Sequence, residues 1–134
     1  MIYLDCDVLV NMDIRDLWEI ETGGNYVAAV VDEGLRKQKL FSVGGLMCWI
    51  NCCKPSAYFN SGVLLMNLAE IRGMGNFFAL SVEWFKYHPH TSEFGDQDAL
   101  NALFFGKVKL IDSRFNRHKG LEDSDLSNSI IHMI

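Results

Sequence analysis

Short apolar blocks separated by polar residues run along the whole chain, and their spacing predicts alternating strands and helices. Residues 1–4 form a short apolar run, and residues 26–31 (YVAAVV) are apolar throughout at the length of a strand. An apolar run without alternating polar positions is typical of a strand buried on both faces. Polar residues 32–34 (DEG) follow it, and we expect them to form a loop.

Three segments have the composition of helices, and they comprise residues 13–20, 68–87 and 96–105. Asp13 is the expected N-cap of the first. Gly73 and Gly75 are expected to split the second. The third, DQDALNALFF, places acidic residues in its first turn and an apolar face behind them, and Gly106 should close it.

Further strands are predicted at residues 57–66, 108–111 and 129–134. In the first of these, Asn60-Ser61-Gly62 should form a turn or a close approach of the backbone. The alternation of strands and helices predicts an α/β domain with a mixed, mostly parallel sheet. Because apolar runs reach both ends of the chain, whereas domain termini usually lie outside the core elements, we expect a piece of a larger domain.

Composition limits the function classes. The 134 residues (15.2 kDa) are 49% hydrophobic, which suits one domain with a core. The chain has 12 Lys and Arg residues against 17 Asp and Glu, and the basic residues cluster only at residues 36–39. This distribution excludes the basic face that nucleic-acid binding needs. No run approaches the ~18 apolar residues of a membrane span, and the start is not that of a signal peptide. We expect a cytoplasmic protein, peripheral to the inner membrane in its full-length form.

The cysteines do not follow the spacing of a metal site. They are Cys6, Cys48, Cys52 and Cys53. A zinc site built from Cys48, Cys52 and a nearby histidine is one alternative, but the spacing favours reduced thiols in an intracellular protein.

Two acidic residues stand in the otherwise apolar stretch YLDCDVLV, residues 3–10. In an extended segment, residues two apart point to the same side, with Cα atoms roughly 6.6–7 Å apart. Asp5 and Asp7 can therefore share one hard divalent cation, and carboxylate oxygens suit magnesium or manganese better than zinc. The alternative is a turn at a strand end with both acids in water.

Four segments in order along the chain resemble glycosyltransferase family 8. They are YLDCDVLV (3–10), YFNSGVLLMNL (58–68), DQDALN (96–101) and IIHM (130–133). The resemblance covers nearly the whole chain except residues 34–56. The family consists of retaining, metal-dependent enzymes with a GT-A fold, and it includes bacterial lipopolysaccharide galactosyl- and glucosyltransferases and glycogenin. The resemblance implies that residues 1–134 are a partial catalytic domain, which begins at the D-x-D strand, lacks the N-terminal part, and ends inside the C-terminal metal-binding segment.

The resemblance also implies a metal site. Asp5 and Asp7 match the family's acids that bind a Mn²⁺ ion, and this ion contacts the donor diphosphate. Mg²⁺ is the alternative ion. Asp5 is therefore also expected to be a donor-binding residue. His132 matches the histidine that begins the H-x-G-x-x-K-P-W segment and completes the metal site, and the chain ends before that segment's glycine and lysine. Taken alone, a histidine in an apolar run indicates a hydrogen-bonded core residue.

The donor sugar is assigned by the same resemblance. Asn60 and Gly62 match the F-N-[SA]-G motif at the sugar. Asp96 would hold sugar hydroxyls, Gln97 would lie near the anomeric carbon, and Asp98 would support both. From the residues alone, the two acids cap a helix. The implied reaction moves galactose or glucose from a UDP-sugar to a saccharide or lipid-linked saccharide acceptor. Retention can use a covalent intermediate or same-face attack, and the poor nucleophilicity of Gln97 favours the latter.

Two rival functions also fit parts of the sequence. Haloacid dehalogenase-like phosphatases likewise begin with an apolar strand and D-x-D, but residues 58–68 would then have no explanation. A catalytically inactive, truncated binding module is the other alternative.

Overall fold

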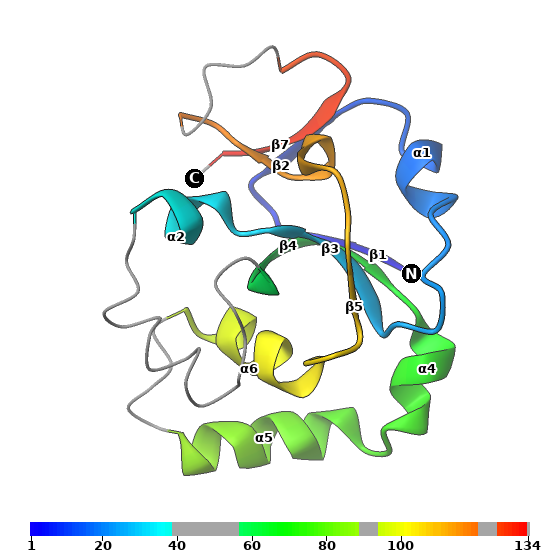
Figure 1. The fold of residues 1–134 in the computed structure, drawn as a ribbon, viewed down its shortest axis with the longest axis vertical. Coiled ribbons are helices and arrows are strands. Elements are labelled where there is room, and N and C mark those ends of the chain that lie inside the picture. The colour runs from blue at the N-terminus through cyan, green and yellow to red at the C-terminus, as the bar shows by residue number, and fades with distance from the viewer. Residues whose placement is uncertain (39–56, 89–93, 121–125, 134) are drawn as a thin grey trace.

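The strands form two sheets in a computed structural model of the chain, which describes residues 1–38, 57–88, 94–120 and 126–133 (Figure 1). The four-stranded sheet has the order β1 (Ile2–Leu4), β4 (Phe59–Met66), β3 (Val27–Val31) and β5 (Val108–Leu110). The three-stranded sheet has the order β2 (Val8–Asn11), β7 (Ser129–His132) and β6 (Arg117–His118). β1 and β2 follow each other in sequence, so the chain passes from one sheet to the other between them.

Both sheets are mixed, as the sequence predicted. β4 runs antiparallel to both β1 and β3, and β7 runs antiparallel to β2. β5 pairs with β3 in parallel, and β6 pairs with β7 in parallel. The expected parallel majority therefore does not hold for the described strands, because the central strand β4 runs against both of its neighbours.

The helices lie around the four-stranded sheet. They are α1 (Arg15–Trp18), α2 (Glu33–Gln38), α4 (Leu68–Gly73), α5 (Phe77–Tyr87), α6 (Asp96–Leu103) and the 3₁₀ turn η2 (Ser113–Phe115). Figure 1 shows α4, α5 and α6 on one side of this sheet and the β2–β7 sheet on the other. The predicted split of the long helix is confirmed: Gly75 has a φ of +92° between α4 and α5, and the Asn76 side chain caps α5.

β3 is buried on both faces, which explains its uninterrupted apolar sequence. Val27 and Ala29 belong to a core cluster with Phe104 and Ile71 of the helical side. Ala28 and Val30 face the opposite way, into a cluster with Leu17, Val63, Leu65, Phe115 and Ile130. The strand therefore separates two apolar layers and contributes to each.

Three local predictions need correction. The N-cap of α1 is Ile14 instead of Asp13, although the Asp13 carboxylate accepts the Arg15 N–H at 2.9 Å. The expected loop at residues 32–34 is instead the start of α2, which begins at Glu33; the carboxylate of the preceding Asp32 accepts the Leu35 N–H at 2.9 Å and so caps the first turn. The turn expected at residues 60–62 is absent, because β4 continues through them with a shift of its register against β3. The other expected possibility, a close approach of the backbone, is found at Gly62, where a Cβ would overlap Cε1 of His132.

Two strands of the second sheet, β2 and β6, were not predicted; among the described residues each of them pairs with β7 alone. Within the described ranges, none of the helices has the length and apolar character needed to cross a membrane.

Candidate metal and sugar site

The two acids of the D-x-D segment lie in the turn between the sheets. The conformation is therefore the strand-end turn given as the alternative above, and not the extended segment. β1 ends at Leu4 and β2 begins at Val8. The turn is fixed at both ends, because the Asp5 N–H donates to the Gly62 carbonyl and the Asp7 carbonyl accepts the Met133 N–H, both at 2.9 Å. Asp5 thus belongs to the β1–β4 edge and Asp7 to the β2–β7 edge.

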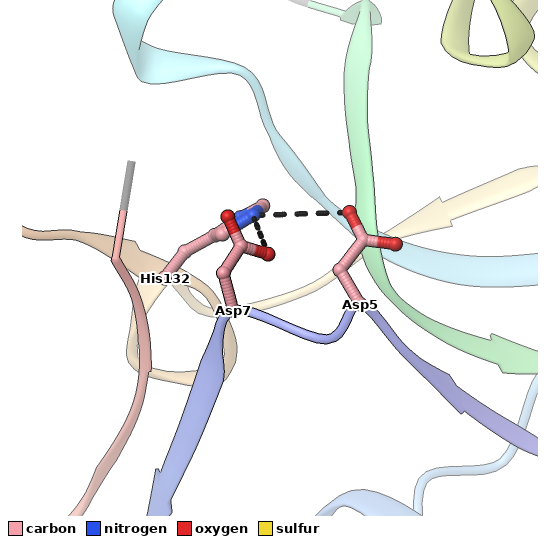
Figure 2. A group of neighbouring side chains, drawn as sticks. All are labelled: Asp5, Asp7 and His132. Carbon is pink, nitrogen blue, oxygen red and sulfur yellow. Dashed lines mark ion pairs between the residues drawn. The ribbon is translucent and has the colours of Figure 1, made fainter.

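His132 brings these acids together with the far end of the chain (Figure 2). It pairs with Val8 in the β2–β7 register, so its side chain lies beside the residue that precedes β2. Its Nε2 lies 3.3 Å from Oδ1 of Asp7 and 3.8 Å from Oδ2 of Asp5. The imidazole is 5% exposed, whereas the side chains of Asp5 and Asp7 are 33% and 48% exposed. The acids are therefore open to a ligand while the histidine is held in the protein.

The donor set fits a divalent cation. One ligand atom from each of the three residues lies within 4.8 Å of the others. Two carboxylate oxygens and one imidazole nitrogen suit manganese or magnesium, with remaining positions for water or phosphate oxygens. The alternative zinc site at Cys48 and Cys52 lies outside the described residues.

Tyr3 is a neighbour of this site that the sequence argument missed. Its hydroxyl donates to Oδ1 of Asp5 at 2.8 Å. This hydrogen bond, with partial burial and the charge of Asp5, raises the pKa of Tyr3 to about 12. Tyr3 therefore keeps its proton at neutral pH and orients one oxygen of Asp5.

A buried network of two amides and one carboxylate joins β4, α6 and the residue that follows β3. The side chains of Asn60 and Gln97 both donate to Oδ2 of Asp32, at 3.3 and 3.0 Å. All three residues are at most 7% exposed. Asp32 was not predicted as part of the site, because residues 32–34 have the composition of a loop; its position directly after a fully buried strand was the signal that could have identified it.

Asn60, Ser61 and Gly62 connect the network to the D-x-D turn. Oδ1 of Asn60 accepts the Gly62 N–H at 2.9 Å, and Oε1 of Gln97 accepts the Ser61 N–H at 2.9 Å. The next carbonyl along, that of Gly62, accepts from Asp5. Three consecutive residues of one strand therefore fix the amides at one end and the acid turn at the other.

The two acids of α6 differ in environment. Asp98 is fully buried and accepts the Tyr58 hydroxyl at 2.6 Å and the Phe94 N–H at 2.9 Å. Burial, together with this hydrogen bond, raises the pKa of Tyr58. Asp96 is exposed and borders an apolar pocket of about 250 Å³ whose lining includes Tyr3 and Phe85. Neither acid is the N-cap residue of α6, which is Gly95.

Comparisons with known proteins agree on one family. The family model described as Glycosyl transferase family 8 matches residues 1–133. A relative from Haemophilus influenzae is 34% identical over 117 residues, which are 86% of this chain and 33% of the relative. The lipopolysaccharide 1,3-galactosyltransferase of Salmonella typhimurium is 27% identical over 141 residues, covering all of this chain and 39% of the enzyme.

Solved structures give the same fold. The galactosyltransferase LgtC, crystallised with donor and acceptor sugar analogues, superposes with a TM-score of 0.78 at 30% identity. The match covers 98% of this chain and 51% of LgtC. The chain thus spans about a third of the length of the curated relatives that it matches and half of this structure. The expected GT-A fold is confirmed.

Proposed function

Because the chain belongs to glycosyltransferase family 8, we propose that it is part of a retaining hexosyltransferase that moves galactose or glucose from a UDP-sugar to a saccharide acceptor. The convergence of Asp5 and Asp7 with His132, 125 or more positions later in the chain, is the observation that carries the proposal. A cation bound between the two carboxylates would relieve their mutual repulsion. In this proposal the residues hold Mn²⁺, with Mg²⁺ as the alternative.

The ion, when bound, would supply Lewis-acid stabilisation of the nucleotide diphosphate as it leaves. The protein's own part is to hold the acids in place before the donor binds. Tyr3 orients Asp5 by its hydrogen bond, and the β2–β7 register fixes His132 beside Asp7. Such preorganisation means that little rearrangement is needed when charge develops.

The amide network is the proposed site for the donor sugar. Asn60 and Gln97 have their orientations fixed by Asp32 and by the backbone of β4. Exposed Asp96 is the side chain available to accept hydrogen bonds from sugar hydroxyls, and buried Asp98 supports it by fixing α6 through Tyr58. An amide is a poor nucleophile, so we favour same-face attack over a covalent intermediate on Gln97.

The names of the relatives indicate the chemical class of the acceptor. One of them is named for galactosyl transfer to lipopolysaccharide, and LgtC was crystallised with sugar analogues of both substrates. We therefore propose a saccharide or lipid-linked saccharide acceptor and a role in lipopolysaccharide biosynthesis. In this proposal the full-length enzyme acts in the cytoplasm, at the surface of the inner membrane when the acceptor is lipid-linked.

Calorimetry of UDP binding with and without Mn²⁺ tests the proposal. We expect UDP binding that requires Mn²⁺ and that is lost in Asp5→Asn and Asp7→Asn. Glu70→Gln, which removes an exposed charge on α4, is the matched control and should bind as the wild type does. Unchanged binding in both aspartate variants would contradict the metal assignment.

Turnover assays separate the rival functions. Hydrolysis of an aryl phosphate without any use of UDP-sugars would support the haloacid dehalogenase-like phosphatase. Manganese-dependent UDP binding without transfer or hydrolysis of UDP-galactose and UDP-glucose would support the truncated binding module. Release of UDP, together with a product sugar that NMR shows to have kept its anomeric configuration, would support the transferase.

A further inference from the structure

Gly62 lies against the imidazole of His132, although its backbone does not require a glycine. The described glycines with positive φ are Gly23, Gly24, Gly75, Gly95, Gly106 and Gly120, and Gly62 is not among them. A methyl group on its Cα would lie 2.7 Å from Nδ1 of His132 and closer still to Cε1. Packed protein atoms do not approach so closely, so any side chain at position 62 displaces the imidazole or the strand.

Within the described part of the chain, no hydrogen bond orients the imidazole from its other nitrogen. Nδ1 of His132 is buried and has no hydrogen-bond partner among the described residues. In most metal sites the second nitrogen of a ligating histidine donates to an acceptor, and that bond fixes the ring. Here the ring is held by packing instead. It contacts Gly62, and it packs edge-on against His118, with centroids 5.3 Å apart and planes at 87°.

Gly62 also fixes the acid side of the same site. Its carbonyl accepts the Asp5 N–H, and its own N–H donates to Oδ1 of Asn60, both at 2.9 Å. One residue of β4 therefore sets the main-chain position of Asp5 and the space available to His132. A shift at position 62 changes the distance between an acid and the imidazole directly.

We propose that Gly62 is a positioning residue of the metal site, which by its lack of a side chain lets Nε2 of His132 face Asp5 and Asp7. This inference rests on the metal site of the proposed function. It gives Gly62 a role that acts through His132, in addition to any contact with the donor.

Mn²⁺ titrations followed by electron paramagnetic resonance test the inference on the whole chain. We expect Gly62→Ala to weaken Mn²⁺ binding at least tenfold. In a His132→Ala background, where the imidazole is gone, Gly62→Ala should change the remaining affinity less than about twofold. Gly73→Ala is the matched control, because a methyl group there meets nothing within 4 Å; it should bind Mn²⁺ as the wild type does.

Thermal unfolding without metal provides a second measurement. Gly62→Ala should lower the unfolding midpoint, and adding His132→Ala should restore part of the loss because it makes room for the new methyl group. Wild-type affinity in Gly62→Ala would overturn the inference and leave the proposed function intact. Equal losses of affinity in the presence and absence of His132 would also overturn it, since Gly62 would then be structural only. Absence of Mn²⁺ binding by the wild type would overturn the metal site itself.

Discussion

Gln97 donates a hydrogen bond from Nε2 to Oδ2 of Asp32 at 3.0 Å, although 65 positions separate the two residues along the chain. The bond joins the first turn of α6 to the end of β3. Both residues are buried, so neither has water as an alternative partner. Asp32 therefore determines the position of an amide that we assign to the donor sugar.

Asp32→Ala should destabilise the protein. The substitution leaves the Leu35 N–H and the side-chain amides of Asn60 and Gln97 without their acceptor. Unsatisfied buried donors cost about 1–3 kcal/mol, so we expect a loss of that order in the free energy of unfolding, measured by urea denaturation. Glu70→Ala, which removes an exposed acid, is the control. Equal midpoints for the two variants would contradict the role given to Asp32.

Mn²⁺ should stabilise the fold if the acids and His132 hold it. At a free Mn²⁺ concentration of about 100 times Kd, linkage predicts a gain of about 2.7 kcal/mol in the free energy of unfolding, and EDTA should reverse it. Asp7→Asn should abolish the gain, because it removes the carboxylate nearest to Nε2 of His132. Differential scanning fluorimetry measures the effect, with Glu70→Gln as the control. A full gain in Asp7→Asn would place the ion elsewhere.

Alkaline pH should destabilise the protein through Tyr58. Burial, and then the hydrogen bond to Asp98, raises the pKa of Tyr58 above its usual value of 10. A raised pKa in the folded state means that this contribution to stability is complete below pH 10 and is lost as pH rises beyond it, because the unfolded chain releases the proton first. We expect Tyr58→Phe to lose less stability than the wild type between pH 9 and 11 in urea titrations.

Tyr3 also lowers the free energy of unfolding at alkaline pH, because its pKa of about 12 exceeds the value in the unfolded chain. This effect is present in both the wild type and Tyr58→Phe. Tyr87→Phe, at an exposed position, is the control and should follow the wild type. Identical pH profiles for Tyr58→Phe and the wild type would show that the Tyr58 hydroxyl is not held as the structure indicates.

Neighbouring phenylalanines at the end of α6 should respond differently to truncation. Phe104 is fully buried and stacks with Phe77 at a centroid distance of 5.6 Å, whereas Phe105 is 52% exposed. We expect Phe104→Ala to cost about 3–5 kcal/mol in the free energy of unfolding, because it leaves a cavity in the core. Phe105→Ala should cost much less in the same urea titration. Similar losses in the two variants would contradict the orientation of α6.

Local patterns in the sequence were sufficient to predict most of the strands and helices. The apolar run of β3 predicted a strand buried on both faces, and Gly73 and Gly75 predicted the break between α4 and α5, because backbone conformation and burial act over a few residues. At residues 60–62, local patterns left a turn or a close approach of the backbone as alternatives. The turn is absent, because the Asn60 side chain finds its partners within the core and the strand continues, whereas the close approach occurs at Gly62.

The sequence was also sufficient to predict which residue types form the site. Two closely spaced acids indicated a hard cation, and the four motifs in order indicated the family. What the sequence alone could not supply was the partner of each group. A loop was predicted around Asp32, and an extended segment and a strand-end turn both fitted Asp5 and Asp7, because the environments of these residues depend on segments far away in the chain.

In the tertiary structure, strand register determines which residues of the site lie next to one another. Pairing of Val8 with His132 brings the end of β7 beside the acid turn, and a shift by one residue would send the imidazole to the opposite face of the sheet. The role of Gly62 depends on the same packing, since nothing near it in sequence shows that an imidazole occupies the space of its missing side chain. Composition and periodicity are local properties, whereas the distance between Asp5 and His132 is set by the packing of two sheets.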